Sequence, residues 1–235
     1  TYAYELKDFS SLAVRKKGER IEISKFVVTV ETDDGLAGTY APHFGATEQA
    51  LAQVKTMAPL LIGLDAEHRG QIFDLLKIRY RHFDKVGIAA LDCALWDLAG
   101  KKYGVSVAKL LGGLSQRLPV YASTCPGVKS SDGLNSIEAY ADFAEECVER
   151  GIPAFKIHGF GDGETKNEIG IMEAIRNRIG HEIKLMTDPA SSLRSFMDAV
   201  EVGKACDDLK FFWYEDPYRD ASSSAAAHGR LRDFI

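Results

Sequence analysis

The sequence Ala154-Phe155-Lys156-Ile157-His158 is a short run of mostly apolar residues, and a second run, Ile183-Lys184-Leu185-Met186-Thr187, follows an amphipathic helical segment at 164–179. A strand, a helix and a second strand in this order are typical of a βαβ unit with parallel strands. The same pattern extends in both directions. Strand-like runs at 118–124, 153–158, 183–187 and 210–214 alternate with helical runs at about 135–150, 164–179, 194–206 and 221–234. We therefore expect four consecutive βα units and a parallel sheet.

Residues 114–235 hold these four units, whereas a closed barrel of eight βα units typically takes ~250 residues. An open four-stranded parallel sheet covered by helices is the alternative, but its edges would need protection, and no Pro or Lys device that would provide it is evident. We therefore predict the first half of a TIM-like (β/α) barrel. Because no initiator Met precedes Thr1, we also expect that residues are missing at the N-terminus.

Residues 1–113 have a different pattern, which predicts an α+β domain. The β-branched, largely alternating stretch 21–32 is followed by Asp33-Asp34-Gly35 and then by 36–40, which indicates a β-hairpin. We expect a further strand at 2–7 beside it. Helical patterns follow near 46–58, 66–81 and 86–102.

The composition argues against several classes of protein. The chain is 46% hydrophobic with a formal net charge of −5, which is typical of a globular protein and does not favour a surface for nucleic acid or anionic membranes. No run of ~18 apolar residues is present, so we expect no membrane-spanning helix. The four cysteines form no C-x-x-C pair, and we expect them to be core thiols of a cytoplasmic protein.

Charged side chains stand at the ends of three successive predicted strands. Because side chains alternate along a strand, Lys156 and His158 share the face opposite Phe155 and Ile157, and we expect both to point into the barrel. Buried there, they would need carboxylates, a metal site or an anionic ligand opposite them. The alternative is that the strand frays and both side chains reach solvent.

The next two strands end in carboxylates, Asp188 before Pro189 and Glu215 before Asp216. Taken singly, each is more typical of an exposed strand end or a helix cap. Together they lie where barrel enzymes carry their active sites, at the carboxyl ends of the strands. Converging carboxylates are ligands for a hard divalent cation, so we predict a Mg²⁺ site at Asp188 and Glu215.

This set of residues indicates proton abstraction next to a carboxylate group. A cation that binds the substrate carboxylate would stabilise the enediolate formed when the α-carbon loses its proton. A lysine base would need a lowered pKa, whereas the pKa of histidine starts near ~6.5, so His158 is the better candidate for the base. We assign Lys156 to holding or polarising the substrate carboxylate.

The sequence resembles the enolase superfamily, specifically its mandelate racemase / muconate lactonizing enzyme branch. The resemblance is carried by residues 87–100, by Leu110-Leu111-Gly112-Gly113, by Lys156-Ile157-His158 and by Trp213-Tyr214-Glu215-Asp216-Pro217. It implies an α+β capping domain, residues 1–113, followed by a (β/α) barrel that is incomplete in this chain. It also implies that Asp188 and Glu215 are the first two Mg²⁺ ligands, and that Asp216 contributes to substrate binding.

Three features depart from the family pattern. His158 stands where the family usually has the second lysine of Lys-x-Lys, which could change the face of the substrate that loses its proton or leave His158 as an acid or a binder. Ala190 stands where the family often has Asn. The third carboxylate ligand and the catalytic group of the opposite face would lie on strands beyond Ile235.

In such relatives two loops of the capping domain close over the barrel mouth, and they correspond to about 9–19 and 42–44 here. A basic loop suits a polyhydroxy acid, so we assign Lys16 and His43 to substrate binding. A solvated charge run and an ordinary loop histidine are the alternatives. The resemblance also implies a homo-oligomer.

The predicted function is Mg²⁺-dependent proton abstraction from a small carboxylate substrate, a sugar acid, with dehydration of the acid sugar as the expected outcome. A racemase, epimerase or cycloisomerase of the same superfamily is the alternative. A half-barrel that acts only as a folding or interaction module is an alternative from a different class. We expect neither nucleic acid nor membrane as a partner, and we expect this chain alone to be inactive.

Overall fold

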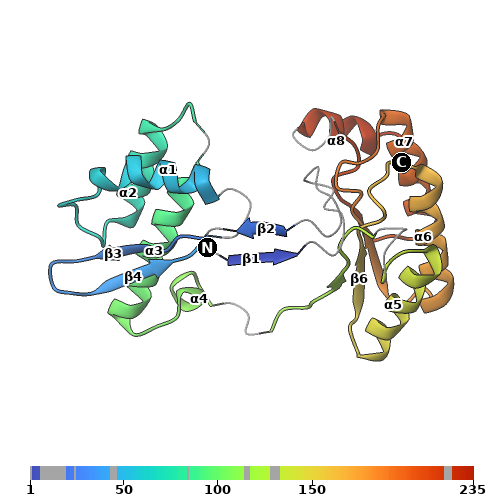
Figure 1. The fold of residues 1–235 in the computed structure, drawn as a ribbon, viewed down its shortest axis with the longest axis horizontal. Helices are drawn as coiled ribbons and strands as arrows, with labels where there is room; N and C mark the ends of the chain where they lie inside the picture. The colour runs from blue at the N-terminus through green and yellow to red at the C-terminus, as the bar shows by residue number, and fades with distance from the viewer. Residues whose placement is uncertain are drawn as a thin grey trace. The chain divides into compact units, whose positions relative to one another are not determined.

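The computed structural model describes residues 2–5, 20–23, 25–42, 47–83, 85–113, 117–127, 133–219 and 224–235. The chain divides into two compact units, of which one contains Ile21–Arg117 and the other Leu118–Ile235 (Figure 1). None of the described helices combines the length and the apolar character needed to span a bilayer.

The predicted hairpin is present in the first unit. β3 (Val28–Glu31) and β4 (Ala37–Tyr40) pair in antiparallel register, and the turn between them contains Gly35 at a φ of 82°, a conformation that favours glycine. The predicted strand 21–32 is interrupted, however. β2 (Arg20–Ile23) pairs with β1 (Tyr2–Glu5) in a separate two-stranded sheet. The strand expected at 2–7 therefore forms, but it does not extend the β3–β4 hairpin.

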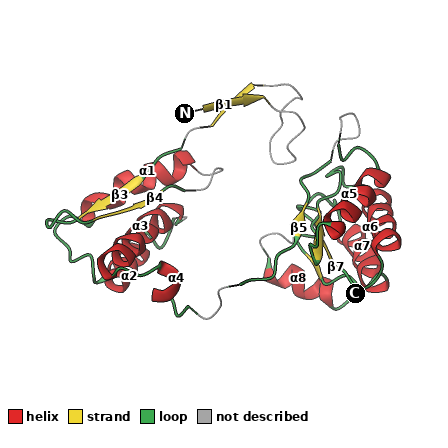
Figure 2. Cartoon of the chain, turned by 90° about the horizontal axis from the view of Figure 1, so that it is seen from below, coloured by secondary structure: helices red, strands yellow, loops and turns green. Residues whose placement is uncertain are grey.

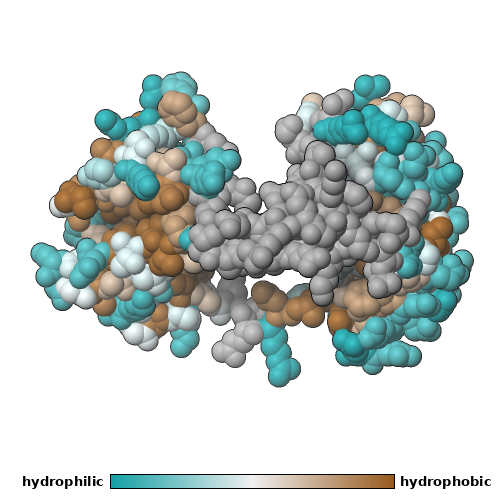
Figure 3. Space-filling model, viewed as in Figure 1, coloured by the Kyte–Doolittle hydropathy of each residue, from teal (hydrophilic) through white to brown (hydrophobic). Residues whose placement is uncertain are grey.

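The three helices predicted for this unit are also present, with one further short helix. They are α1 (Thr47–Met57), α2 (Arg69–Arg79), α3 (Val86–Tyr103) and the short α4 (Val107–Leu110), with a 3₁₀ turn, η1 (Ala58–Leu60), after α1. Of the described helices in this unit, α3 buries the most residues. The hairpin packs closely against it at Gly38, where a Cβ would overlap the carbonyl group of Ala94. Figure 3 shows apolar side chains gathered on one face of this unit. Val27 and Ile62 are exposed and line a hollow of the same unit.

The second unit is built from the predicted βα units. Its four-stranded parallel sheet has the order β5-β6-β7-β8, the same as the order along the chain. The strands are β5 (Ala122–Ser123), β6 (Ala154–Ile157), β7 (Lys184–Thr187) and β8 (Trp213–Tyr214). The helices are α5 (Ile137–Glu149), α6 (Thr165–Ile179), α7 (Phe196–Asp208) and α8 (Ala225–Arg232). Parallel neighbours that follow one another in the chain are the arrangement of successive barrel strands.

The core of this unit lies between the sheet and its helices. Figure 2 shows α5, α6 and α7 on one side of the sheet. Phe155 and Ile157 of β6 point to that side and are fully buried, so the prediction that they face the helices is confirmed. Lys156 consequently points to the opposite face.

The prediction of four core thiols is only partly right. All four cysteines are free, as expected, and Cys147 and Cys206 are buried. Cys93 is half-buried and Cys125 is exposed, because it follows the short strand β5 instead of lying within a longer one. The sequence run 118–124 had indicated a strand longer than the two residues that pair.

Candidate active site

The register of the parallel sheet places three predicted site residues in one row. Ile157 lies opposite Thr187, and Thr187 lies opposite Tyr214. The residues that follow these three are His158, Asp188 and Glu215, which therefore share the carboxyl edge of the sheet. Backbone hydrogen bonds continue the pairing there, since Asp188 N–H donates to the Ile157 carbonyl at 2.8 Å and Glu215 N–H to that of Thr187 at 2.9 Å.

The side chains of these residues converge on one another. Lys156 Nζ lies 2.8 Å from Asp188 Oδ2 and 2.9 Å from Glu215 Oε2. His158 Nε2 lies 2.8 Å from the same Asp188 oxygen. The side chains of Lys156 and Asp188 are only 8% and 7% exposed. Of the three counter-groups considered for the two basic residues, carboxylates are present, and the alternative of a frayed strand is wrong.

The contacts of this cluster stabilise its charged forms. Burial alone would raise the pKa of Asp188, but hydrogen bonds from His158, from Lys156 and from the Ala190 N–H hold it well below its usual range. Burial works against the charge on Lys156, but hydrogen bonds to Asp188 and Glu215 outweigh it and raise the pKa. The two carboxylates thus favour the ammonium form of Lys156.

His158 is held by its backbone from two sides. Its N–H donates to Thr124 Oγ1 at 2.7 Å, and its carbonyl accepts from the Tyr140 hydroxyl at 2.7 Å. Thr124 is 4% exposed and Tyr140 is fully buried. Sequence reasoning missed both residues. A polar residue at the end of the first strand-like run could have pointed to Thr124, whereas Tyr140 lies within the apolar face of a helix and carries no such signal.

Strained backbone follows both carboxylate residues in the chain. Ala190, Ser191 and Asp216 have φ values of 50°, 58° and 38°, in the left-handed region that non-glycine residues rarely adopt. Ala190 N–H donates to Asp188 Oδ1 at 2.9 Å, and Ser191 N–H donates to the Asp216 carbonyl at 2.8 Å. Local strain of this kind is typical of functional sites. Asp216 thus contributes its backbone to the link between the two loops, and its role in substrate binding stays a prediction.

Aromatic rings line one side of the cluster. Trp213 Nε1 lies 3.2 Å from Glu215 Oε2, and the Trp213 ring meets Tyr121 edge to face at a centroid distance of 5.5 Å. Lys156 Nζ lies 6.0 Å from the centre of the Tyr121 ring. These rings reduce the access of water to the ammonium and strengthen its pairing with the carboxylates.

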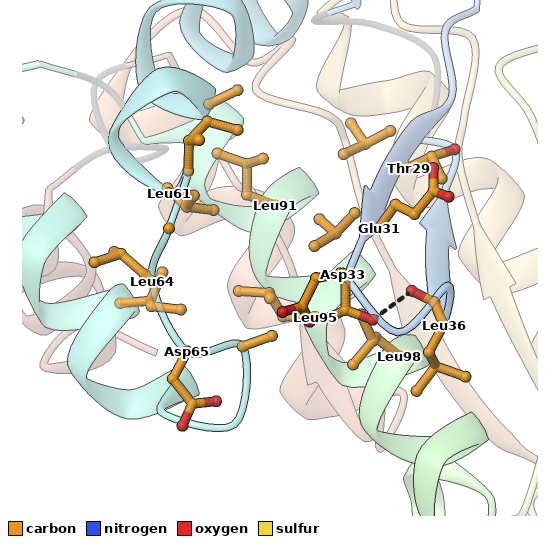
Figure 4. Close-up of a pocket in the computed structure, with 18 of the residues that line it drawn as sticks. Thr29, Glu31, Asp33, Leu36, Leu61, Leu64, Asp65, Leu91, Leu95 and Leu98 are labelled. Atoms are coloured by element: carbon orange, nitrogen blue, oxygen red, sulfur yellow. Dashed lines mark hydrogen bonds between the residues drawn. The ribbon is translucent and has the colours of Figure 1, made fainter.

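Two predicted site residues, Lys16 and His43, lie outside the described residues. A hollow of about 790 Å³ is present in the first unit, where leucines of α3, namely Leu91, Leu95 and Leu98, face Leu61 (Figure 4). Its lining is mainly apolar, and none of the described site residues contributes to it. We therefore place the candidate active site at the carboxyl edge of the parallel sheet.

The donor set at this edge fits a divalent cation in part. Within the described part of the chain, no three His, Cys, Asp or Glu side chains are arranged around a metal position. Two carboxylate oxygens, from Asp188 and Glu215, nevertheless lie within 2.9 Å of a single positively charged nitrogen. Oxygen atoms gathered around one positive charge suit a hard cation such as Mg²⁺, for which these residues would be two of the ligands.

Consecutive parallel βα units with charged groups at the carboxyl ends of the strands define the class of (β/α)-barrel enzymes. The profile of the mandelate racemase / muconate lactonizing enzyme N-terminal domain matches residues 17–112, and the profile described as enolase C-terminal domain-like matches residues 139–235. The chain belongs to the enolase superfamily, in its mandelate racemase / muconate lactonizing enzyme branch. Its fold is a capping domain followed by an incomplete (β/α) barrel, as predicted.

Several characterised relatives are sugar-acid enzymes. The chain is 29% identical to D-galactarolactone cycloisomerase of Agrobacterium fabrum over 81% of its own length and 50% of the relative's. It is 28% identical to arabinonate dehydratase of Saccharolobus solfataricus over 84% of its length and 54% of that enzyme. A crystal structure of D-glucarate dehydratase from Agrobacterium tumefaciens, complexed with magnesium, superimposes with a TM-score of 0.78 at 26% identity and covers 100% of this chain and 62% of that one. The chain thus spans about half the length of the curated relatives it matches.

Proposed function

We propose that the protein of which this chain forms at least a part removes the proton α to the carboxylate of a sugar acid in a Mg²⁺-dependent reaction, and that dehydration follows. The observation that carries this proposal is the convergence of Lys156, His158, Asp188 and Glu215 at one edge of the sheet. In this proposal residues 1–113 form the capping domain and residues 114–235 the half-barrel. The relatives, which include an arabinonate dehydratase, support a small carboxylate substrate.

Each residue of the cluster has a distinct proposed role. Asp188 and Glu215 would hold the cation, which when bound supplies Lewis-acid stabilisation of negative charge on the substrate carboxylate. Lys156, an ammonium in a nearly dry position, suits binding of that carboxylate. His158 would take the α-proton at Nε2, the nitrogen that faces the site. Asp216, Lys16 and His43 would contact the sugar hydroxyls.

Cycloisomerisation, racemisation or epimerisation is the second candidate outcome. These reactions share the first proton abstraction with dehydration and differ in the later fate of the enediolate. The relatives include a D-galactarolactone cycloisomerase as well as dehydratases, which favours this shared first step over any one outcome. A homo-oligomer and a cytoplasmic location remain predictions from the sequence.

The experiment that tests the proposal measures the shared first step. The protein of which this chain forms at least a part is incubated in D₂O with Mg²⁺ and a panel of sugar acids, among them arabinonate, galactonate and glucarate, and exchange of the α-proton is followed by ¹H NMR. We expect exchange that requires Mg²⁺ and is reduced at least about 100-fold in His158→Gln and in Glu215→Gln. Glu201→Gln, on an exposed position of α7, is the matched control. Exchange that persists unchanged in Glu215→Gln would contradict the metal assignment.

A further inference from the structure

The ammonium group of Lys156 stands between the two carboxylates that the proposed function assigns to a metal. Its nitrogen is 2.8 Å from Asp188 Oδ2 and 2.9 Å from Glu215 Oε2, on the two neighbouring strand ends. The Lys156 side chain is 8% exposed. One lysine thus holds together residues that come from different βα units.

This arrangement leaves the cluster short of positive charge. The two carboxylates at this edge repel each other, and one of them, that of Asp188, is buried. Lys156 neutralises one of the two negative charges, and His158, when neutral, adds none. A divalent cation would neutralise both carboxylates, so a single ammonium is the weaker of the two counter-charges.

The hydrogen-bonding capacity of Asp188 is already in use. Its Oδ2 atom contacts both Lys156 Nζ and His158 Nε2, and its Oδ1 atom accepts from the Ala190 N–H. A cation and an ammonium cannot both lie close to Oδ2 without strong repulsion between them. Lys156 therefore has to move away from Asp188 Oδ2 before this oxygen can bind a metal.

We propose, on the basis of the function proposed above, that Lys156 is the built-in counter-cation of the Asp188–Glu215 pair, and that it competes with the divalent cation for these two carboxylates. Its displacement frees the ammonium to bind a substrate carboxylate. The same displacement releases His158 Nε2 from its contact with Asp188, and an imidazole that carries its one proton on Nδ1 can then accept a proton at Nε2. Lys156 thereby lowers the affinity of the site for the metal. It also couples metal binding to substrate binding, because only the displaced ammonium can bind the substrate carboxylate.

The test compares Mg²⁺ binding by the 235-residue chain and by three variants, using isothermal titration calorimetry. Lys156→Met removes the competing charge and Lys156→Arg keeps it. Lys184→Met is the matched control, because Lys184 belongs to neighbouring β7 but is exposed and lies over the Phe212 ring at 4.8 Å. We expect Lys156→Met to bind Mg²⁺ at least about tenfold more tightly than the wild type, and the other two variants to bind within about twofold of it.

Trp213 gives an independent readout of the same site. Its Nε1 atom lies 3.2 Å from Glu215 Oε2, so Tb³⁺ bound at these carboxylates would be sensitised by its excitation. The chain has two tryptophans, and a Trp96→Phe background leaves Trp213 alone. We expect the Tb³⁺ signal to saturate at lower concentration in Lys156→Met.

A second measurement uses the wild-type chain and does not depend on the folding of a site variant. Lysine acetylation is quantified by mass spectrometry with and without Mg²⁺. Displacement predicts that Mg²⁺ increases the acetylation of Lys156 several-fold and leaves that of Lys184 unchanged. This readout decides the question if Lys156→Met does not fold.

Two results would overturn the proposal, and they are distinguishable. In the first, Lys156→Met binds Mg²⁺ no more tightly than the wild type and Mg²⁺ has no effect on Lys156 acetylation, but Glu215→Gln binds Mg²⁺ more weakly. This result would exclude the competition and would support the proposed metal site. Absence of Mg²⁺ and Tb³⁺ binding in the wild type and in Lys156→Met removes both the competition and the assignment of Asp188 and Glu215 to a metal site.

Discussion

The carboxyl group of Glu168, in the first turn of α6, packs against the backbone of Gly159, the residue that follows His158. A Cβ on Gly159 would lie 2.6 Å from Glu168 Cδ, so a larger residue at 159 does not fit. Glu168 is fully buried, and neither of its oxygens has a hydrogen-bond partner among the described residues. A buried acid therefore lies directly behind the loop that carries the candidate base.

The burial of Glu168 predicts that stability depends on pH. Burial raises its pKa to about 7, Asp162 adds to the shift, His158 opposes it and Asp188 adds to it. Because Glu168 ionises near the ordinary value of 4.5 in the unfolded chain, its contribution to stability is greatest below that pH, falls as pH rises to about 7, and is level above it. A shift of this size corresponds to about 3 kcal/mol of unfolding free energy.

Glu168→Gln should remove most of this pH dependence, and Glu173→Gln, at an exposed position of the same helix, should leave it intact. The measurement is urea unfolding of the second unit between about pH 4 and 8, followed by Trp213 fluorescence in a Trp96→Phe background. An unchanged slope in Glu168→Gln would show that Glu168 ionises normally.

Gly159→Ala is predicted to destabilise the second unit by about 1–3 kcal/mol, because the new methyl group overlaps the Glu168 carboxyl group. Gly229→Ala in α8 is the control, since nothing lies within 4 Å of a Cβ there, and it should be neutral or stabilise by about 0.5–1 kcal/mol. In the double variant Gly159→Ala/Glu168→Ala, the cost should be less than the sum of the single costs. Equal effects of the two single glycine variants would refute the close contact.

Ala190→Gly is predicted to increase stability by up to about 1 kcal/mol, because glycine adopts a φ of 50° without the strain that a Cβ introduces. Ala174→Gly is the control on α6, where glycine should instead cost about 1 kcal/mol. Opposite signs for the two alanine variants in urea unfolding are the expected result. A loss of stability in both would mean that the loop after Asp188 is not strained.

Arg176→Met is predicted to cost at least about 3 kcal/mol, since Arg176 is 3% exposed and its guanidinium group donates to four backbone carbonyls. These belong to Leu209, Gly180, Ile183 and Lys210, at 2.9, 2.7, 3.0 and 3.1 Å. Arg178→Met is the matched control, because Arg178 makes only solvent-exposed ion pairs and should change stability by less than about 1 kcal/mol. Similar midpoints of unfolding for the two variants would contradict a structural role for Arg176.

Much of the fold was predictable because its elements have local signals. The helices α5 and α6 begin and end within a few residues of the predicted bounds, since apolar periodicity acts over one or two turns. The lengths of β5 and β8 were not predictable. Strand length depends on how far neighbouring strands pair, and only two residues pair at each edge of this sheet.

The sequence was sufficient to predict which residues line up at the candidate site, but not all of their contacts. Strand alternation and the carboxyl ends of parallel strands were sufficient to bring together His158, Asp188 and Glu215. Glu168 and Arg176 were not identified, because a charged residue that is buried in a helix has the same local sequence pattern as one on its surface. Their burial became visible only when the neighbouring loops and helices were in place.

Local sequence was sufficient for the order of the βα units and for the chemistry at their ends, because both depend on the backbone geometry of single strands and helices. The pairing of charges required the assembled sheet. Lys156 is 32 residues from Asp188 and 59 from Glu215 along the chain, and no local rule joins them. The register between strands and the reach of one long side chain decided that a lysine holds the two carboxylates, and this contact determines which group a metal has to displace.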